Sequence, residues 1–133
     1  MIIADTSIWI DFFRNKLEEK EIFLRLIEND YMLMPEVVAG ELLQGAKSDK
    51  EVRIIKSYVK NLRNFIEADL FIVAGEYSYK NNLINKGIGF IDAVIIATAI
   101  RSNSKIWTKD LKLKEYLEKR YIYEPSLYSI YKS

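Results

Sequence analysis

An apolar run that stops at an acidic residue opens this chain and restricts its fold more than any other feature. Residues 1–4 are all apolar, and Asp5-Thr6-Ser7 follows them directly. This order is typical of a buried strand that ends where a helix begins. In open α/β folds, ligands bind beyond the carboxyl ends of such strands. Asp5 is therefore the first candidate site residue.

Strand and helix patterns alternate along the remaining chain. The strands are expected at residues 1–4, 31–33, 64–67, 105–107 and 120–123. The helices are expected at residues 7–13, 15–29, 35–45, 48–63, 70–86, 91–101 and 111–119. This alternation predicts an α/β fold with a central, mostly parallel sheet covered by helices on both faces, a three-layer α/β/α sandwich. The 133 residues are the size of one domain, so residues 1–133 are expected to form a single domain.

Composition narrows the possible chemistry. The chain has no His and no Cys, so catalysis would depend on carboxylates, hydroxyls, Lys, Arg or Tyr. A protein-ligated metal would have to be one that prefers oxygen ligands. The net charge is only +1, so a nucleic-acid surface would have to be local. The absence of Cys, of a signal-peptide pattern and of a membrane-length apolar stretch predicts a cytoplasmic protein without a membrane segment.

Three aspartates each allow two interpretations. Asp5, Asp92 and Asp110 all precede helical patterns, and aspartate is favoured at helix N-caps. However, Asp5 and Asp110 also follow predicted strands. If these strands are parallel neighbours, both residues emerge at one edge of the sheet. A capping role and a role in a shared site therefore both stay open for each aspartate.

Glu41 favours a shared site. Val37, Val38 and Gly45 lie on its face of the predicted helix, and no Lys or Arg lies three or four residues away. A buried glutamate without a partner is costly, and a metal ion would compensate it. Clustered carboxylates repel one another, and Mg²⁺ relieves that repulsion while keeping water and phosphate oxygens as ligands. Such a site suits phosphodiester cleavage or phosphoryl transfer.

Four segments in order resemble the motifs of PIN-domain nucleases, especially the VapC-type toxins of type II toxin-antitoxin systems. They are residues 5–11, 38–45, 91–99 and 106–110, and each contains one of the acids Asp5, Glu41, Asp92 and Asp110. One departure is visible. Family members often continue the fourth motif with a second aspartate and a phenylalanine, where this chain has Lys112 and Leu113. Asp110 is thus the only acid of that loop.

The resemblance implies a function and a set of roles. It implies a PIN-like α/β/α fold and Mg²⁺- or Mn²⁺-dependent endoribonuclease activity, with a cognate antitoxin and a homodimer as partners. The metal-binding and catalytic acids would be Asp5, Glu41, Asp92 and Asp110. The supporting hydroxyls would be Thr6, Ser7 and Thr108.

Other classes fit the residues less well. A haloacid-dehalogenase-like phosphatase would need an acid two residues after Asp5, where Ser7 stands. A response-regulator receiver would need a phosphorylatable aspartate after its third strand, and none is evident. An RNA-processing nuclease without an antitoxin and a catalytically silent RNA- or protein-binding module remain as alternatives.

Basic and aromatic residues suggest partners. A cluster around the fourth motif would contact the RNA backbone, with Lys105, Lys109 and Lys112 as candidates. A basic stripe on the predicted helix at 48–63 is either a solvated face or a second phosphate contact. Apolar residues of the same helix suit either internal packing or the homodimer interface, namely Val52, Ile55, Val59 and Leu62. Tyrosines could stack on bases or pack in the core.

Overall fold

A small parallel sheet forms the centre of the protein, which a computed structural model describes over residues 1–126. Its strands are β1 (Ile2–Ala4), β2 (Met32–Leu33) and β3 (Lys105–Trp107), in the order β2-β1-β3. Ile2 pairs with Met32 on one side and with Lys105 on the other, so all three strands run in the same direction. The first strand and the strand at 105–107 are thus parallel neighbours, which is the condition under which Asp5 and Asp110 emerge at one edge of the sheet.

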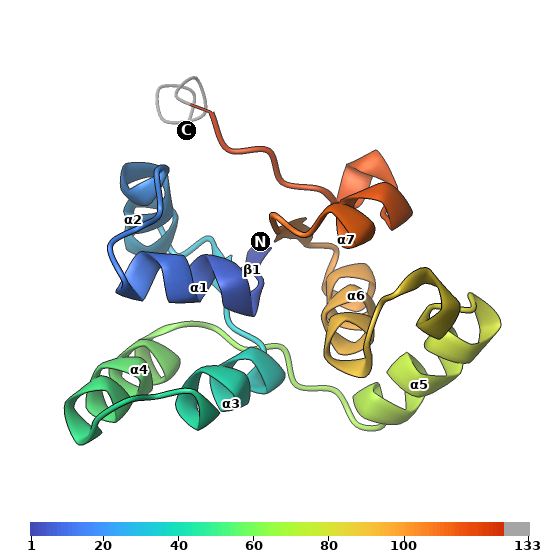
Figure 1. Ribbon diagram of the computed structural model, residues 1–133, viewed down its shortest axis with the longest axis horizontal. Coiled ribbons are helices and arrows are strands. Elements are labelled where there is room, and N and C mark those ends of the chain that lie inside the picture. Colours follow the sequence, from blue (N-terminus) through green and yellow to red (C-terminus); the bar gives the residue numbers. More distant parts are fainter. Residues whose placement is uncertain (127–133) are drawn as a thin grey trace.

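Seven helices surround this sheet (Figure 1). They are α1 (Thr6–Phe13), α2 (Lys20–Glu28), α3 (Glu36–Gln44), α4 (Asp49–Asn61), α5 (Leu70–Lys80), α6 (Phe90–Ser102) and α7 (Leu111–Tyr116). Helix α6 packs against β3 and α5, while α1 packs against β1 and α3. The α/β/α arrangement is the predicted one. Within residues 1–126, none of the helices is both long and apolar enough to cross a membrane.

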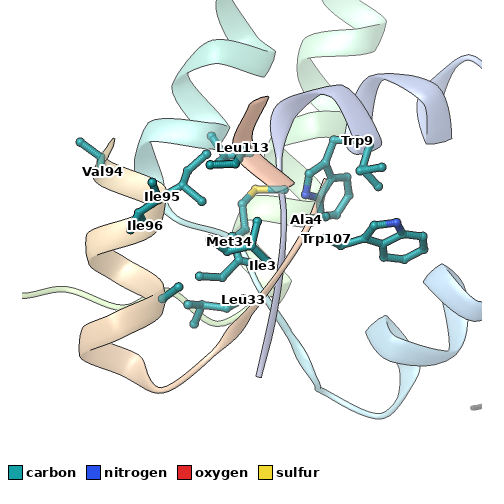
Figure 2. Packing of buried hydrophobic residues seen from close by; sticks show 14 of the residues in the cluster. Ile3, Ala4, Trp9, Leu33, Met34, Val94, Ile95, Ile96, Trp107 and Leu113 are labelled. Carbon is teal, nitrogen blue, oxygen red and sulfur yellow. The ribbon is translucent and has the colours of Figure 1, made fainter. Parts of the chain in front are cut away.

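Helix α6 is the central helix, as its continuous apolar sequence predicts. Every residue from 93 to 99 is buried, including Thr98, whose hydroxyl donates to the carbonyl of Val94 at 2.7 Å. Figure 2 shows side chains of α6 on one side of β1 and the indoles of Trp9 and Trp107 on the other. Both faces of the sheet are therefore covered, which explains why its strands carry no alternating polar residues.

Two predicted strands are absent. Residues 64–67 form no strand, and the backbone pairing at this edge is a parallel bridge between Leu33 and Arg63, the residue before the segment. The segment at 120–123 instead contains the short 3-10 turn η2 (Lys119–Tyr121) and one bridge between Ile106 and Ile122. At both sheet edges a single β-bridge takes the place of a continuous strand pairing. The apolar residues there therefore cover the edges without extending the sheet.

Three predicted helices are shorter than expected, and the one expected at 111–119 ends at Tyr116. The helix expected at 15–29 begins only at Lys20, after Asn15 takes a left-handed φ of 57°. The helix expected at 70–86 ends at Lys80, Asn82 takes a φ of 54°, and a separate 3-10 turn η1 (Ile84–Lys86) follows. Asparagine tolerates this left-handed conformation, which interrupts the helical hydrogen bonds. Gly87, the expected end of the whole helix, instead ends η1, with a left-handed φ of 76°.

The helix from Ser48 begins as its sequence predicts. The Ser48 hydroxyl accepts a hydrogen bond from the Glu51 amide at 3.1 Å. Of the apolar residues on this helix, Ile55 is 1% exposed and belongs to the core, whereas Val59 is 39% exposed. Internal packing therefore accounts for Ile55.

Candidate active site

The four predicted acids meet at one open cavity beyond the carboxyl ends of β1 and β3. The cavity has a volume of about 460 Å³. Its lining consists of acids, hydroxyls and one lysine: Asp5, Thr6, Ser7, Glu41, Asp92, Lys109 and Asp110. These residues come from four segments that lie far apart in the sequence, which the parallel sheet and the packing of α3 and α6 bring together.

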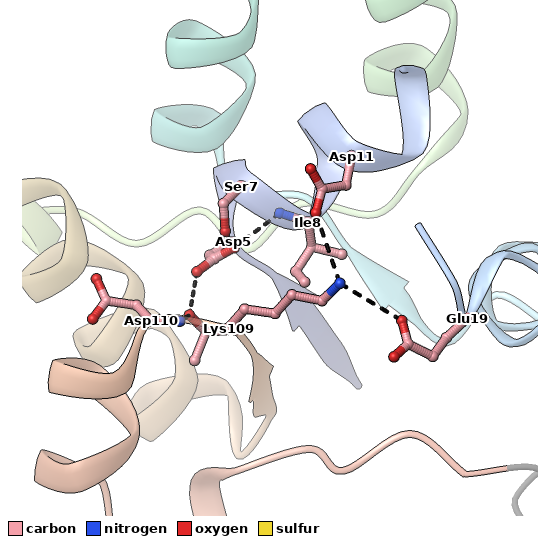
Figure 3. A network of polar contacts seen from close by, with 8 residues as sticks. Asp5, Ser7, Ile8, Asp11, Glu19, Lys109 and Asp110 are labelled. Atoms are coloured by element: carbon pink, nitrogen blue, oxygen red, sulfur yellow. Dashed lines mark hydrogen bonds and ion pairs between the residues drawn. The ribbon is translucent and has the colours of Figure 1, made fainter. Parts of the chain in front are cut away.

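Asp5 is both a helix cap and a cavity residue. Its backbone is extended and its amide donates to the carbonyl of Trp107 at 3.0 Å, which joins the ends of β1 and β3. Its Oδ1 accepts hydrogen bonds from the Ile8 amide at 3.1 Å and the Ser7 hydroxyl at 2.7 Å. Its Oδ2 accepts a hydrogen bond from the Thr108 hydroxyl (Figure 3). Asp5 is 6% exposed, and these three neutral donors hold its carboxylate in one orientation.

Asp110 also caps a helix, and Thr108 connects it to Asp5. The Asp110 Oδ1 accepts from the amides of Lys112 and Leu113 at 2.9 and 3.2 Å, at the start of α7. The Asp110 amide in turn donates to the Thr108 hydroxyl at 3.0 Å. Thr108 is 2% exposed and therefore links the first and fourth motifs from inside the fold. For Asp5 and Asp110, the capping and site interpretations are compatible.

Glu41 lies in the middle of α3, half-buried, with its side chain at the cavity. The Thr6 hydroxyl donates a hydrogen bond to its Oε1 at 2.5 Å. The sequence predicted an inward-facing glutamate without a nearby cation, and its neighbour proves to be a hydroxyl from α1. One carboxylate oxygen has this partner, so the group retains capacity for further ligands.

Asp92 is not a helix cap. The cap position of α6 belongs to Gly89, and Asp92 lies in the first turn of the helix. Among the described residues none donates a hydrogen bond to its carboxylate. Burial, followed by the charges of Asp5, Asp110 and Glu41, raises the pKa of Asp92 to about 6. The cavity therefore lacks the positive charge that would balance its carboxylates, and the raised pKa of Asp92 is the consequence.

The donor set fits a hard divalent cation. All its candidate ligands are carboxylate oxygens, and a cation would relieve the repulsion that raises the pKa of Asp92. Within residues 1–126, no group of three or more acidic side chains lies close enough together to hold a metal ion in the present geometry. Mg²⁺ commonly uses one or two carboxylates and completes its shell with water and phosphate oxygens, so an incomplete protein shell suits it.

The three lysines predicted to contact RNA occupy different places. Lys109 lines the cavity, and its ammonium lies 3.7 Å from Asp11 Oδ2 and 3.9 Å from Glu19 Oε2. Lys105 begins β3 and so lies at the opposite end of that strand from the cavity. The aliphatic chain of Lys112 lies over Gly87, outside the cavity lining. Sequence reasoning missed the ion pairs of Asp11 and Glu19, because no local spacing links them to Lys109.

Comparisons with known proteins agree with this fold. The sequence matches the family described as "PIN domain" over residues 2–119. No curated protein sequence matches the chain. Several solved structures are similar in fold at low sequence identity.

Three of these structures are two VapBC structures and one toxin-antitoxin complex. The structure of VapBC2 from Rickettsia felis bound to a promoter DNA fragment has a TM-score of 0.66 at 22% identity, covering 93% of this chain and 98% of that one. DNA-bound VapBC from Salmonella typhimurium has a TM-score of 0.69 at 23% identity, with coverage of 91% and 93%. A toxin-antitoxin complex from Klebsiella pneumoniae has a TM-score of 0.68 at 18% identity, with coverage of 92% and 100%.

Proposed function

We propose a function for this chain, which belongs to the PIN domain family. It is a Mg²⁺- or Mn²⁺-dependent endoribonuclease and the toxin of a toxin-antitoxin pair. The observation that carries this proposal is the cavity itself. Four acids from separate segments converge there, and among residues 1–126 their only cationic neighbour in the lining is Lys109. That arrangement is unfavourable in a protein that binds no cation, because the carboxylates repel one another.

The residues of the cavity would have two roles, binding the cation and orienting the carboxylates. The cation would be held by Asp5, Glu41, Asp92 and Asp110. When bound, the ion supplies an activated water and offsets charge on the phosphate. Ser7 and Thr108 keep Asp5 in its orientation, and Thr6 does the same for Glu41. Asp92 accepts no hydrogen bond from the described residues, so its carboxylate is the one most available to a new ligand.

The RNA substrate would enter an open cavity. Lys109 at its margin can contact a phosphate by charge, which requires only reach and no sequence recognition. Lys105 and Lys112 lie outside the cavity lining, so we assign them at most contacts with RNA that extends beyond the cleaved bond.

The toxin role rests on the fold similarity to toxin-antitoxin complexes. An open acidic cavity gives an inhibitor two physical routes. A partner could place an Arg or Lys among the carboxylates, or cover the entrance with an apolar segment. A homodimer is also part of the proposal. Exposed apolar residues that suit such an interface surround a second cavity of about 380 Å³, among them Ile66, Phe71 and Ile72.

Metal-dependent cleavage is tested with purified protein and single-stranded RNA. We expect cleavage with Mg²⁺ or Mn²⁺ that leaves 5′-phosphate ends and that stops in EDTA. Asp5→Asn, which removes a carboxylate but keeps the size of the side chain, should be inactive. Undiminished cleavage in EDTA would refute the mechanism, and wild-type cleavage by Asp5→Asn would remove that residue from the site.

The toxin role is tested separately in cells. Expression of the chain should arrest growth, Asp5→Asn should be harmless, and co-expression of a small protein encoded beside it should restore growth. Harmless expression of an enzyme that cleaves RNA in vitro would instead favour an RNA-processing nuclease without an antitoxin. Absence of cleavage under every metal condition would favour a catalytically silent binding module.

A further inference from the structure

We propose that Asp11 and Glu19 are positioning residues that hold the ammonium of Lys109 outside the acidic cavity. Held there, the lysine cannot occupy the position of the divalent cation that the proposed function requires. This inference rests on the proposed function and concerns residues outside the four-acid set.

Lys109 lies where its ammonium could compete with a metal ion for the acids of the cavity. It follows Thr108, which is hydrogen bonded to Asp5, and precedes Asp110. It is the one cationic residue in the lining of the cavity that the described residues form. A lysine side chain is long and flexible, so its ammonium can reach anions on several sides of its own Cα.

The lysine side chain nevertheless points away from Asp110 and towards two acids outside the cavity lining. Figure 3 shows its side chain running from the loop before α7 towards α1 and the start of α2, with Asp110 on the other side of Asp5. Its ammonium lies 3.7 Å from Asp11 Oδ2 and 3.9 Å from Glu19 Oε2. Two carboxylates on separate helices therefore compete with the cavity for one ammonium.

The burial of Glu19 strengthens this hold. Its Oε2 is shielded from solvent and accepts no hydrogen bond from the described residues. A shielded anionic oxygen is costly without a compensating charge, and Lys109 provides the cation beside it. The side chain of Lys109 is 45% exposed, so the attraction is moderate and can be removed by substitution.

Removing both acids should redirect the ammonium. Without Asp11 and Glu19 as anions, the carboxylates that attract Lys109 most strongly are those of the cavity it lines. An ammonium among these carboxylates would neutralise part of their charge and oppose the entry of a divalent cation. Metal binding should therefore weaken for a reason that depends on Lys109.

A double-mutant cycle tests this dependence with Mn²⁺ alone and no RNA. The dissociation constant for Mn²⁺ is measured by calorimetry and electron paramagnetic resonance in low-salt buffer. The proteins are the wild type, K109M, the pair D11N/E19Q, and the triple variant that combines all three changes. We expect D11N/E19Q to bind Mn²⁺ about three- to tenfold more weakly than the wild type. K109M should change affinity by about twofold or less in the wild type, but should restore it in the D11N/E19Q background.

A matched control separates this effect from simple loss of negative charge. E18Q/E21Q removes two exposed acids from the same region and leaves the ion pairs of Lys109 in place. It should weaken Mn²⁺ binding by less than D11N/E19Q does. Circular dichroism checks each fold, and the single variants D11N and E19Q replace the pair if the pair does not fold.

The outcomes discriminate between the two proposals. Equal effects of K109M in both backgrounds, or a control as weak as D11N/E19Q, would overturn the positioning role while the metal site stands. No Mn²⁺ binding by the wild type would overturn the proposed function together with this inference.

Discussion

Replacing Asp92 with Asn should stabilise the protein in the absence of metal, although it removes a residue of the proposed catalytic site. Burial and three neighbouring acids raise the pKa of Asp92 from 3.8 to about 6. Asparagine has nearly the same shape and no charge, so it removes the repulsion. No hydrogen bond from the described residues is lost with the carboxylate.

The magnitude follows from the pKa. The difference between 3.8 and about 6 corresponds to about 3 kcal/mol, because one pKa unit is about 1.4 kcal/mol. The side chain is only half-buried, and solvent screening reduces the effect to about 1–2 kcal/mol. For a chain of this length, that is a rise in Tm of about 3–10 °C.

The sign depends on pH. Between pH 4 and pH 6 the folded wild type holds more protons at this site than the unfolded chain, so its free energy of unfolding falls as pH rises through this window. Below the window the penalty is absent, and above it the penalty is complete. The advantage of Asp92→Asn should therefore be full near pH 7 and small near pH 4.

Urea denaturation in EDTA at both pH values measures this difference. Asp69→Asn is the matched control, since Asp69 is exposed at the start of α5 and its side chain makes no capping bond there. It should change stability by less than about 0.5 kcal/mol. An Asp92→Asn protein that is no more stable than the wild type at pH 7, or equally favoured at pH 4, would refute the repulsion argument. Added Mg²⁺ should stabilise the wild type more than the variant.

Substitutions at three further positions probe the surrounding structure. Thr108→Val should cost about 1–3 kcal/mol of stability and most RNA cleavage, because Asp5 and the Asp110 amide lose the buried hydroxyl between them, whereas Thr108→Ser should retain most of both. Gly87→Ala should lower stability by about 1 kcal/mol in thermal melts, since φ is 76° and its Cβ would lie 2.9 Å from Lys112 Cδ. Ser48→Ala should cost about 1 kcal/mol through the lost cap of α4, with RNA cleavage unchanged.

Asp→Asn substitutions should affect stability differently at Asp5 and Asp110, because both carboxylates accept capping hydrogen bonds. Asp5 accepts three hydrogen bonds and Asp110 accepts two, all from neutral donors. Replacing either carboxylate would disturb those bonds, so stabilisation is expected for Asp92→Asn and not for the same change at these two residues. All three aspartates precede a helical pattern in the sequence, and only their hydrogen-bond partners in the fold show that their roles differ.

Local physical chemistry determined much of this protein from its sequence. The apolar run before Asp5, the Ser48 cap, the stop at Gly87 and the buried helix around residues 93–99 all depend on neighbours within a few positions. Such features can therefore be predicted without knowledge of the fold. The same holds for the four acids, because each is conspicuous against its own apolar surroundings.

Tertiary structure decided what depends on distant segments. Residues 64–67 and 120–123 have strand-like sequences, yet the only bridges at these sheet edges among the described residues are those of Arg63, just before the first segment, and of Ile122. A ladder needs a partner strand of matching length and direction. The hydrogen bond of Thr6 to Glu41 joins residues 35 positions apart, and that of Thr108 to Asp5 joins residues 103 apart. Lys109 turns towards Asp11 and Glu19 because the fold places two helices beside its loop, and no sequence spacing contains that geometry.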